Sequence, residues 1–165
     1  MKSIKRSSWV RASVALAVVA ALPLQAHHSF APYDMQKVKV VTGVVTRVNP
    51  DANHLQIFFA AMNAERKNVE RDADNKPIIW SVEMAGSAAS AQDGISVSSF
   101  PQGTVFSVAV HPARNGDPSG FREGPLFQCP MAASGKAQPP KPGQHCDSVE
   151  GVKAFGQGKL PAPVN

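Results

Sequence analysis

Five short segments with the residue pattern of β-strands constrain the fold of this chain more than any other feature. Each is rich in Val, Ile, Thr or Phe, and in several of them inward and outward positions alternate, as in a strand with one buried face. Turns rich in Asn, Pro and Gly separate most of the segments. The predicted strands are Val38–Val48, His54–Met62, Pro77–Met84, Thr104–His111 and Phe121–Met131.

The order of these segments predicts a mainly β fold with one short helix. Ser87–Asp93 is rich in Ala and stops at Gly94, which is typical of a short helix with a glycine cap. Gly43, in the middle of the first strand, indicates a bulge or a sharp bend, as at the corner of a barrel. The nearest common architecture is a small five-stranded OB-like β-barrel, and a β-sandwich remains the alternative.

Residues 1–26 have the three parts of a secretory signal peptide. A basic start is followed by an apolar run from Ala12 to Leu22, and the segment ends on the small residue Ala26. The run is shorter than the roughly 20 residues that a spanning helix needs. We therefore expect a periplasmic or secreted protein with no membrane anchor after cleavage and with His27 as its first residue.

The mature chain divides into a folded part and a tail. We expect a β-barrel-like domain over residues 27–150, including a hairpin closed by a disulfide. Residues 151–165 are rich in Gly and Pro, and this composition predicts a flexible tail. The length of the chain allows one ordinary domain.

The basic composition of the precursor does not indicate a nucleic-acid-binding protein. The sequence has 17 Lys and Arg residues against 12 Asp and Glu residues. Four of the bases, Lys2, Lys5, Arg6 and Arg11, lie in the predicted signal peptide, so the mature chain is nearly balanced in charge. Such a chain lacks the positive field that attracts phosphates, and we expect no nucleic-acid partner.

Cys129 and Cys146 are the two cysteines of the chain, and export predicts that they pair with each other. The sequence between them is rich in Pro and Gly and has few apolar residues to bury, so a crosslink would supply a constraint that packing does not. The alternative is a soft metal site built from Cys129, Met131, His145 and Cys146. Oxidation of thiols in such a compartment favours the disulfide.

Several motifs of the mature chain resemble those of one family. H-H-S-F at residues 27–30 is followed by Y-D, by T-G-V-V-T-R-V-N-P, by W-S-V-E-M and by V-A-V-H-P-A-R-N-G. These motifs are similar to those of a family of small secreted bacterial proteins known only as a domain of unknown function. The resemblance covers about residues 27–114, and the part with the cysteines resembles only some members. In many members a histidine follows the Asn-Pro turn, where this chain has Asp51 and the nearest histidine is His54. The resemblance implies export and a fold, and it implies no activity.

The amino terminus that cleavage would create is the most suggestive feature for function. The α-amine and the ring of His27 can bind one metal together, because the amine has an ordinary pKa of about 8 and a metal can displace its proton. A third nitrogen from His28, His54 or His111 would complete a T-shaped set suited to copper(II), as in a histidine brace. The sequence therefore predicts a periplasmic binding protein for copper or another small ligand.

Two other functions remain open from the sequence. A copper site with an open coordination position would suit an oxidase or its auxiliary subunit, although the chain contains no G-x-S-x-G, phosphate-loop or H-E-x-x-H motif. A solvated, metal-free histidine pair would suit an interaction protein of the cell envelope. An apolar ligand pocket and an ordinary core explain the aromatic residues equally well. These residues are Phe58, Phe59, Trp80, Phe100 and Phe106. Binding without catalysis is the function that we expect.

Overall fold

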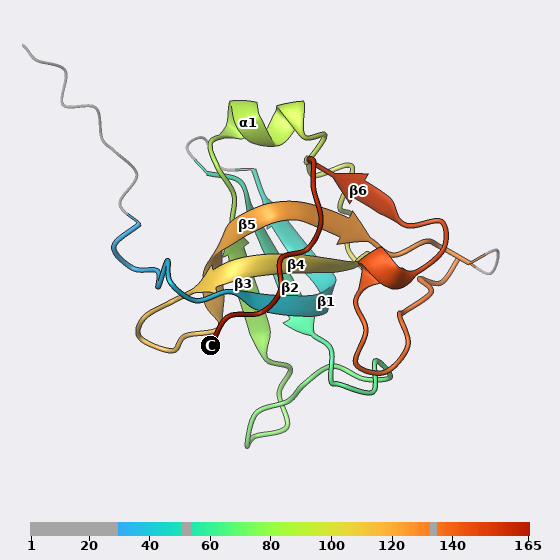
Figure 1. Ribbon diagram of the computed structural model, residues 1–165. Coiled ribbons are helices and arrows are strands. Elements are labelled where there is room, and N and C mark those ends of the chain that lie inside the picture. Colours follow the sequence, from blue (N-terminus) through green and yellow to red (C-terminus); the bar gives the residue numbers. More distant parts are fainter. Residues whose placement is uncertain (1–29, 51–53, 133–134) are drawn as a thin grey trace, which may run out of the picture.

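Each segment with a strand pattern forms a strand in the computed structural model, which describes residues 30–50, 54–132 and 135–165 (Figure 1). The five strands are β1 (Lys39–Asn49), β2 (Gln56–Ala61), β3 (Ile79–Glu83), β4 (Val105–Pro112) and β5 (Ser119–Gln128). The other elements are α1 (Ser87–Gln92), a 3-10 helix η1 (Cys146–Ser148) and a short strand β6 (Lys153–Phe155). No helix in this described part is long and apolar enough to cross a membrane.

The strands close into a barrel with OB-like connectivity. β2 pairs with β1 and β3, and β4 pairs with β1 and β5, all in antiparallel fashion. A parallel pairing between β3 and β5 completes the ring and sets Glu83 beside Phe121. The predicted five-stranded OB-like barrel is therefore confirmed, and the β-sandwich is wrong, because two stacked sheets would leave the β3 and β5 edges unpaired. The predicted short helix is also present, and it covers one end of the barrel (Figure 1).

Side chains fill the interior of this barrel. Phe59, Phe100 and Phe106 have no exposed surface, and Trp80 keeps 8% exposed. The rings of Phe59 and Phe106 meet edge to face with 5.0 Å between their centroids. Phe58, on the alternate face of β2, is only partly buried. Four of the five aromatic residues considered as a pocket lining are thus core residues.

Gly43 serves close packing between β1 and β2. A Cβ atom at this position would lie 2.3 Å from Cδ2 of Phe59 and 2.7 Å from the carbonyl oxygen of Ala60. The irregularity in the register of β1 lies further along, between Val45 and Arg47. The bulge is therefore displaced from the position predicted for it, and the glycine instead lets a core ring approach the backbone of β1.

The C-terminal segment lies on the outside of the barrel. β6 pairs antiparallel with the end of β5, and Val164 exchanges two backbone hydrogen bonds with Val38, of 3.0 and 2.9 Å. In Figure 1 the last residues cross the outer side of β5 and β4 toward the start of β1. The Gly and Pro content of residues 151–165, from which a flexible tail is predicted, gives no sign of these pairings, because composition does not indicate which strand edge a loop returns to.

Substitution of Gly43 by Ala should lower the free energy of unfolding by about 1–3 kcal/mol, because the new methyl group overlaps Phe59 and the Ala60 carbonyl in a filled core. Denaturant unfolding would measure the loss. When Phe59→Leu is added, the combined loss should be smaller than the sum of the two single losses, because the smaller side chain makes room. Equal stability of the Gly43→Ala variant and the wild type would contradict the packing argument.

Candidate functional site

The segment that follows the predicted amino terminus is held against the outside of the barrel. The ring of Phe30 contacts Phe121 of β5 edge to face, with 4.9 Å between their centroids. Tyr33 forms an antiparallel bridge with Ala113, just beyond the end of β4. We call residues 30–38 the N-terminal arm. Its contacts bring it to the junction where β3 and β5 close the barrel.

Glu83, the last residue of β3, connects this arm to His54. The hydroxyl of Tyr33 donates to Oε2 of Glu83 over 2.6 Å. Nδ1 of His54 lies 3.3 Å from Oε1 of the same carboxylate, and the two side chains are 17% and 25% exposed. Tyr33, Glu83 and His54 therefore form one partly buried polar cluster, which we call the Tyr33–Glu83–His54 cluster.

Strand register explains why these residues meet. Alternation along β3 turns Trp80 and Val82 into the core and leaves Glu83 on the outer face. Gln56 of β2 pairs with Glu83, which brings His54, two residues before Gln56, to the end of β3. The sequence pattern predicts the outward position of Glu83, but its partners come from the arm and from the β1–β2 connection.

The surroundings of the cluster determine which atoms carry protons. Burial raises the pKa of the Tyr33 phenol, and the hydrogen bond and negative charge of Glu83 raise it further, so the phenol remains a donor at neutral pH. Nδ1 of His54 faces two acceptors, the Glu83 carboxylate and the carbonyl oxygen of Met84 at 3.1 Å. An N–H at Nδ1 can donate to either of these acceptors.

His111, another predicted ligand, has a different role. Its Nδ1 lies 2.8 Å from the carbonyl oxygen of Lys37, and its Nε2 lies 3.1 Å from Oε2 of Glu123. Both partners only accept, and metal ligation through either nitrogen would displace the oxygen atom that faces it. The His111 side chain is 9% exposed, and its contacts connect the N-terminal arm to β4 and β5.

The two cysteines form the predicted disulfide, with their Cα atoms 4.9 Å apart. The soft metal site proposed as an alternative is therefore wrong, because the two sulfur atoms are bonded to each other. The disulfide lies in a second apolar cluster, outside the barrel, together with Met62, Val105 and Phe127. This cluster holds the segment that the Cys129–Cys146 bond closes, which we call the C-terminal hairpin, against β4 and β5.

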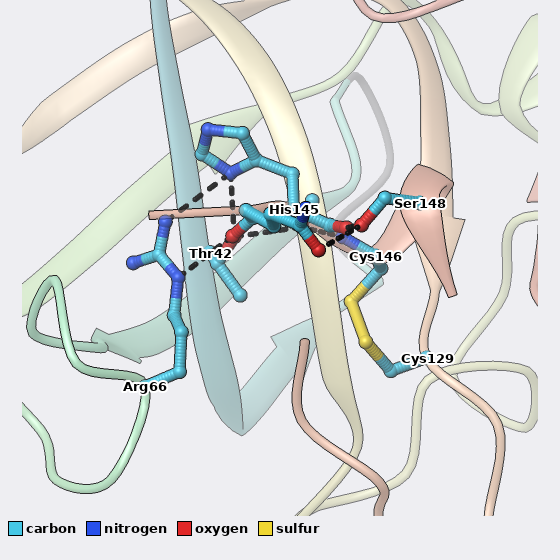
Figure 2. The surroundings of a disulfide bond; sticks show 8 residues. Thr42, Arg66, Cys129, His145, Cys146 and Ser148 are labelled. Carbon is cyan, nitrogen blue, oxygen red and sulfur yellow. Dashed lines mark hydrogen bonds between the residues drawn. A yellow bond between two sulfur atoms is a disulfide. The ribbon is translucent and has the colours of Figure 1, made fainter. Parts of the chain in front are cut away.

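His145, the residue before Cys146, contacts the barrel. Its Nδ1 lies 2.8 Å from Oγ1 of Thr42 in β1. Figure 2 shows the imidazole beside Thr42 and Arg66, with the disulfide on the far side of the backbone. The sequence carries no signal for this contact, because Thr42 and His145 are 103 residues apart.

Among the described residues, no three His, Cys, Asp or Glu side chains gather as a metal-binding group. His54 and His111 belong to separate hydrogen-bond networks. His27 and His28 lie outside the described residues.

These features define a small barrel protein with OB-like connectivity and an arm docked on its outer surface. Residues 12–122 match a family described as a family of unknown function, DUF6152, and the chain belongs to this family. The expected membership in a family of unknown function is thereby confirmed. The matched residues include the arm, Glu83 and His54, and they end before the disulfide. No curated protein and no solved structure matches the chain significantly.

Substitution of Tyr33 by Phe should lower the free energy of unfolding by roughly 1 kcal/mol, because the partly exposed Glu83 carboxylate loses a short hydrogen bond. Chemical denaturation would measure this loss. In a Glu83→Gln background the same substitution should cost less, because the Tyr33 hydroxyl then donates to a neutral amide oxygen instead of a carboxylate. A Tyr33→Phe variant as stable as the wild type would show that water replaces the bond without net loss.

Replacement of Cys129 and Cys146 together by Ser should destabilise the protein by about 3 kcal/mol, because the crosslink restricts the unfolded chain over a separation of 17 residues. Unfolding curves of the variant and of the wild type with reductant should coincide. A reduced wild type as stable as the oxidised protein would contradict this role of the disulfide.

Proposed function

We propose that this protein is an exported copper-binding protein in which the mature amino terminus and His54 share one Cu(II) ion. One observation carries the proposal. The arm that follows the predicted terminus is docked at the β3–β5 junction, where Glu83 contacts both Tyr33 and His54. The disulfide supports the predicted export, because such bonds persist in oxidising compartments.

The proposal requires the amino terminus to reach His54 from the docked arm. His27 is three residues before Phe30, and three residues of extended chain span about 10 Å. Phe30 contacts Phe121, and Phe121 is paired with Glu83 in the barrel. The α-amine and ring nitrogen of His27 would supply two ligands, and His54 would supply the third.

The two acceptors at Nδ1 of His54 are of the kinds that orient a metal-ligating histidine. Such a histidine usually donates its other ring N–H to a carboxylate or a backbone carbonyl, which orients the ring and makes its free nitrogen more basic. Nδ1 of His54 faces both kinds of acceptor, in Glu83 and Met84. His111 faces acceptors at both nitrogens, and Nδ1 of His145 accepts from a hydroxyl, so neither has this arrangement.

Three nitrogen donors with an amine among them favour copper over the other divalent metals of the first row. Copper(II) has the highest affinity in that series for nitrogen sites and accepts planar arrangements. Glu83 would hold the ring of His54 in place, and Tyr33 would hold Glu83. His28 remains available as an alternative ligand from the same segment.

Calorimetric titration of protein that begins at His27 with Cu(II) tests the proposal. One ion should bind, and His54→Ala should weaken binding at least about tenfold, because one of three ligands is lost. One extra residue before His27 should have a similar effect, because it converts the α-amine into an amide. Electron paramagnetic resonance should show nitrogen ligation in the wild type.

His145→Asn is the matched control, since this histidine belongs to a separate network and the variant should bind copper as the wild type does. Unchanged affinity in both the His54→Ala and the extended protein would contradict the proposed ligands. No copper binding by the correctly processed protein would overturn the proposal and favour a metal-free interaction protein.

A further inference from the structure

A chain of hydrogen bonds fastens the C-terminal hairpin to the barrel, independently of the proposed copper site (Figure 2). Thr42 of β1 and Ser107 of β4 are paired in the sheet and are 1% and 0% exposed. Oγ of Ser107 accepts from the amide of Cys146 over 2.8 Å. Oγ1 of Thr42 lies 2.7 Å from Oγ of Ser107 and 2.8 Å from Nδ1 of His145.

The protons in this chain can satisfy every group when Nδ1 of His145 is an acceptor. The amide of Cys146 can only donate, so it donates to Ser107. Ser107 then donates to Thr42, and Thr42 donates to His145. Each buried hydroxyl proton has an acceptor, and the neutral ring keeps its own proton on Nε2.

Arg66 reinforces the same state of the ring. Its Nε donates to the carbonyl oxygen of Gln144 over 2.8 Å, and one of its terminal nitrogens donates to that of Asn63 over 3.1 Å. The other terminal nitrogen lies 3.5 Å from Nδ1 of His145. A guanidinium has no acceptor to offer, so Nδ1 again serves as the acceptor.

A proton on Nδ1 would disturb this arrangement in two ways. His145 would donate to Thr42, and Thr42 would have to donate to Ser107, which already accepts from Cys146. The hydroxyl proton of the buried Ser107 would then have no acceptor in the chain, which is costly. The imidazolium would also face the positive charge of Arg66.

The charged groups that face His145 come from two segments. Arg66, in the loop after β2, opposes a positive ring, and Asp147, in η1, favours it. β1 and β4 contribute the uncharged hydroxyls of Thr42 and Ser107. Burial lowers the pKa of His145 most, Arg66 lowers it further, and Asp147 offsets part of the effect.

We propose that His145 is a proton-sensitive latch, which holds the hairpin on β1 and β4 when neutral and releases it when protonated in mildly acidic solution. Release would uncover the outer face of β4 and the apolar cluster around Met62, Val105 and Phe127. The Cys129–Cys146 disulfide keeps the hairpin attached to the end of β5, so the opening stays local and reversible.

The direction of the pH effect follows from the lowered pKa of His145. The closed state binds this proton less readily than the open state, so the latch is complete above the ordinary histidine value of about 6.5. Its contribution falls as the pH decreases below that value, and opening becomes up to about tenfold more favourable for each pH unit within the window.

Hydrogen exchange of the Cys146 amide, which bonds to Ser107, tests the latch in metal-free protein with the disulfide intact. Its protection factor should be constant between pH 7.5 and about 6.5 and should decrease below that range by up to about tenfold per unit. In His145→Asn the profile should be flat, because the side-chain oxygen accepts from Thr42 and does not titrate. His54→Asn is the control and should keep the wild-type profile.

Arg66→Gln provides a second measurement if the His145 variant does not fold. The total loss of protection on acidification should be smaller, because removal of the guanidinium charge brings the pKa of His145 in the closed state nearer to its ordinary value. A flat wild-type profile, a wild-type profile in His145→Asn, or an undiminished total loss in Arg66→Gln would overturn the proposal.

Discussion

The parallel pairing of β3 with β5 is the interaction on which the rest of this structure depends. It joins Ser81, Val82 and Glu83 to Ser119, Gly120 and Phe121, and so closes the antiparallel sheet of order β3-β2-β1-β4-β5 into a ring. A side chain at Gly120 would lie 2.7 Å from Cβ of Val110 and 2.9 Å from the carbonyl oxygen of His111, so the glycine allows β5 to lie this close to β4. Closure encloses the aromatic core, and it also sets Glu83 and Phe121 side by side on the outer surface. The N-terminal arm docks on this pair.

Side chains fill the interior of the barrel. The polar clusters that involve histidines therefore lie outside this interior. Two segments cover that surface at different places, the N-terminal arm at the β3–β5 junction and the disulfide-linked hairpin over β1 and β4. A histidine takes part in each attachment, and its partners determine the state of its ring. His54 faces acceptors at Nδ1, His111 faces acceptors at both nitrogens, and His145 accepts at Nδ1. The three histidines therefore differ in role. His54 is the candidate metal ligand, His111 holds the N-terminal arm, and His145 is the proposed proton-sensitive contact.

The fold could be predicted further than the site. Strand patterns locate all five barrel strands to within a few residues, since burial of one face imposes a period of two on the side chains. The Ala-rich stretch before Gly94 correctly predicts the short helix, and the two cysteines correctly predict their bond. Prediction was less successful where contacts join distant segments. The role of Gly43 depends on the ring of Phe59, and the strand pairing of Lys153–Phe155 depends on the exposed edge of β5.

The sequence by itself determined that this chain forms a mainly β domain with one short helix and a disulfide, and that it belongs to a family of unknown function. These properties follow from local periodicity, turn-forming residues and cysteine chemistry, which neighbouring residues encode. Only the tertiary structure decided that Tyr33 meets Glu83 and that Thr42 and Ser107 meet the hairpin at His145 and Cys146. A hydrogen bond between residues 50 or 103 positions apart leaves no local pattern. It forms because barrel closure and the return of the chain over the outer surface bring its donor and acceptor within about 3 Å of each other.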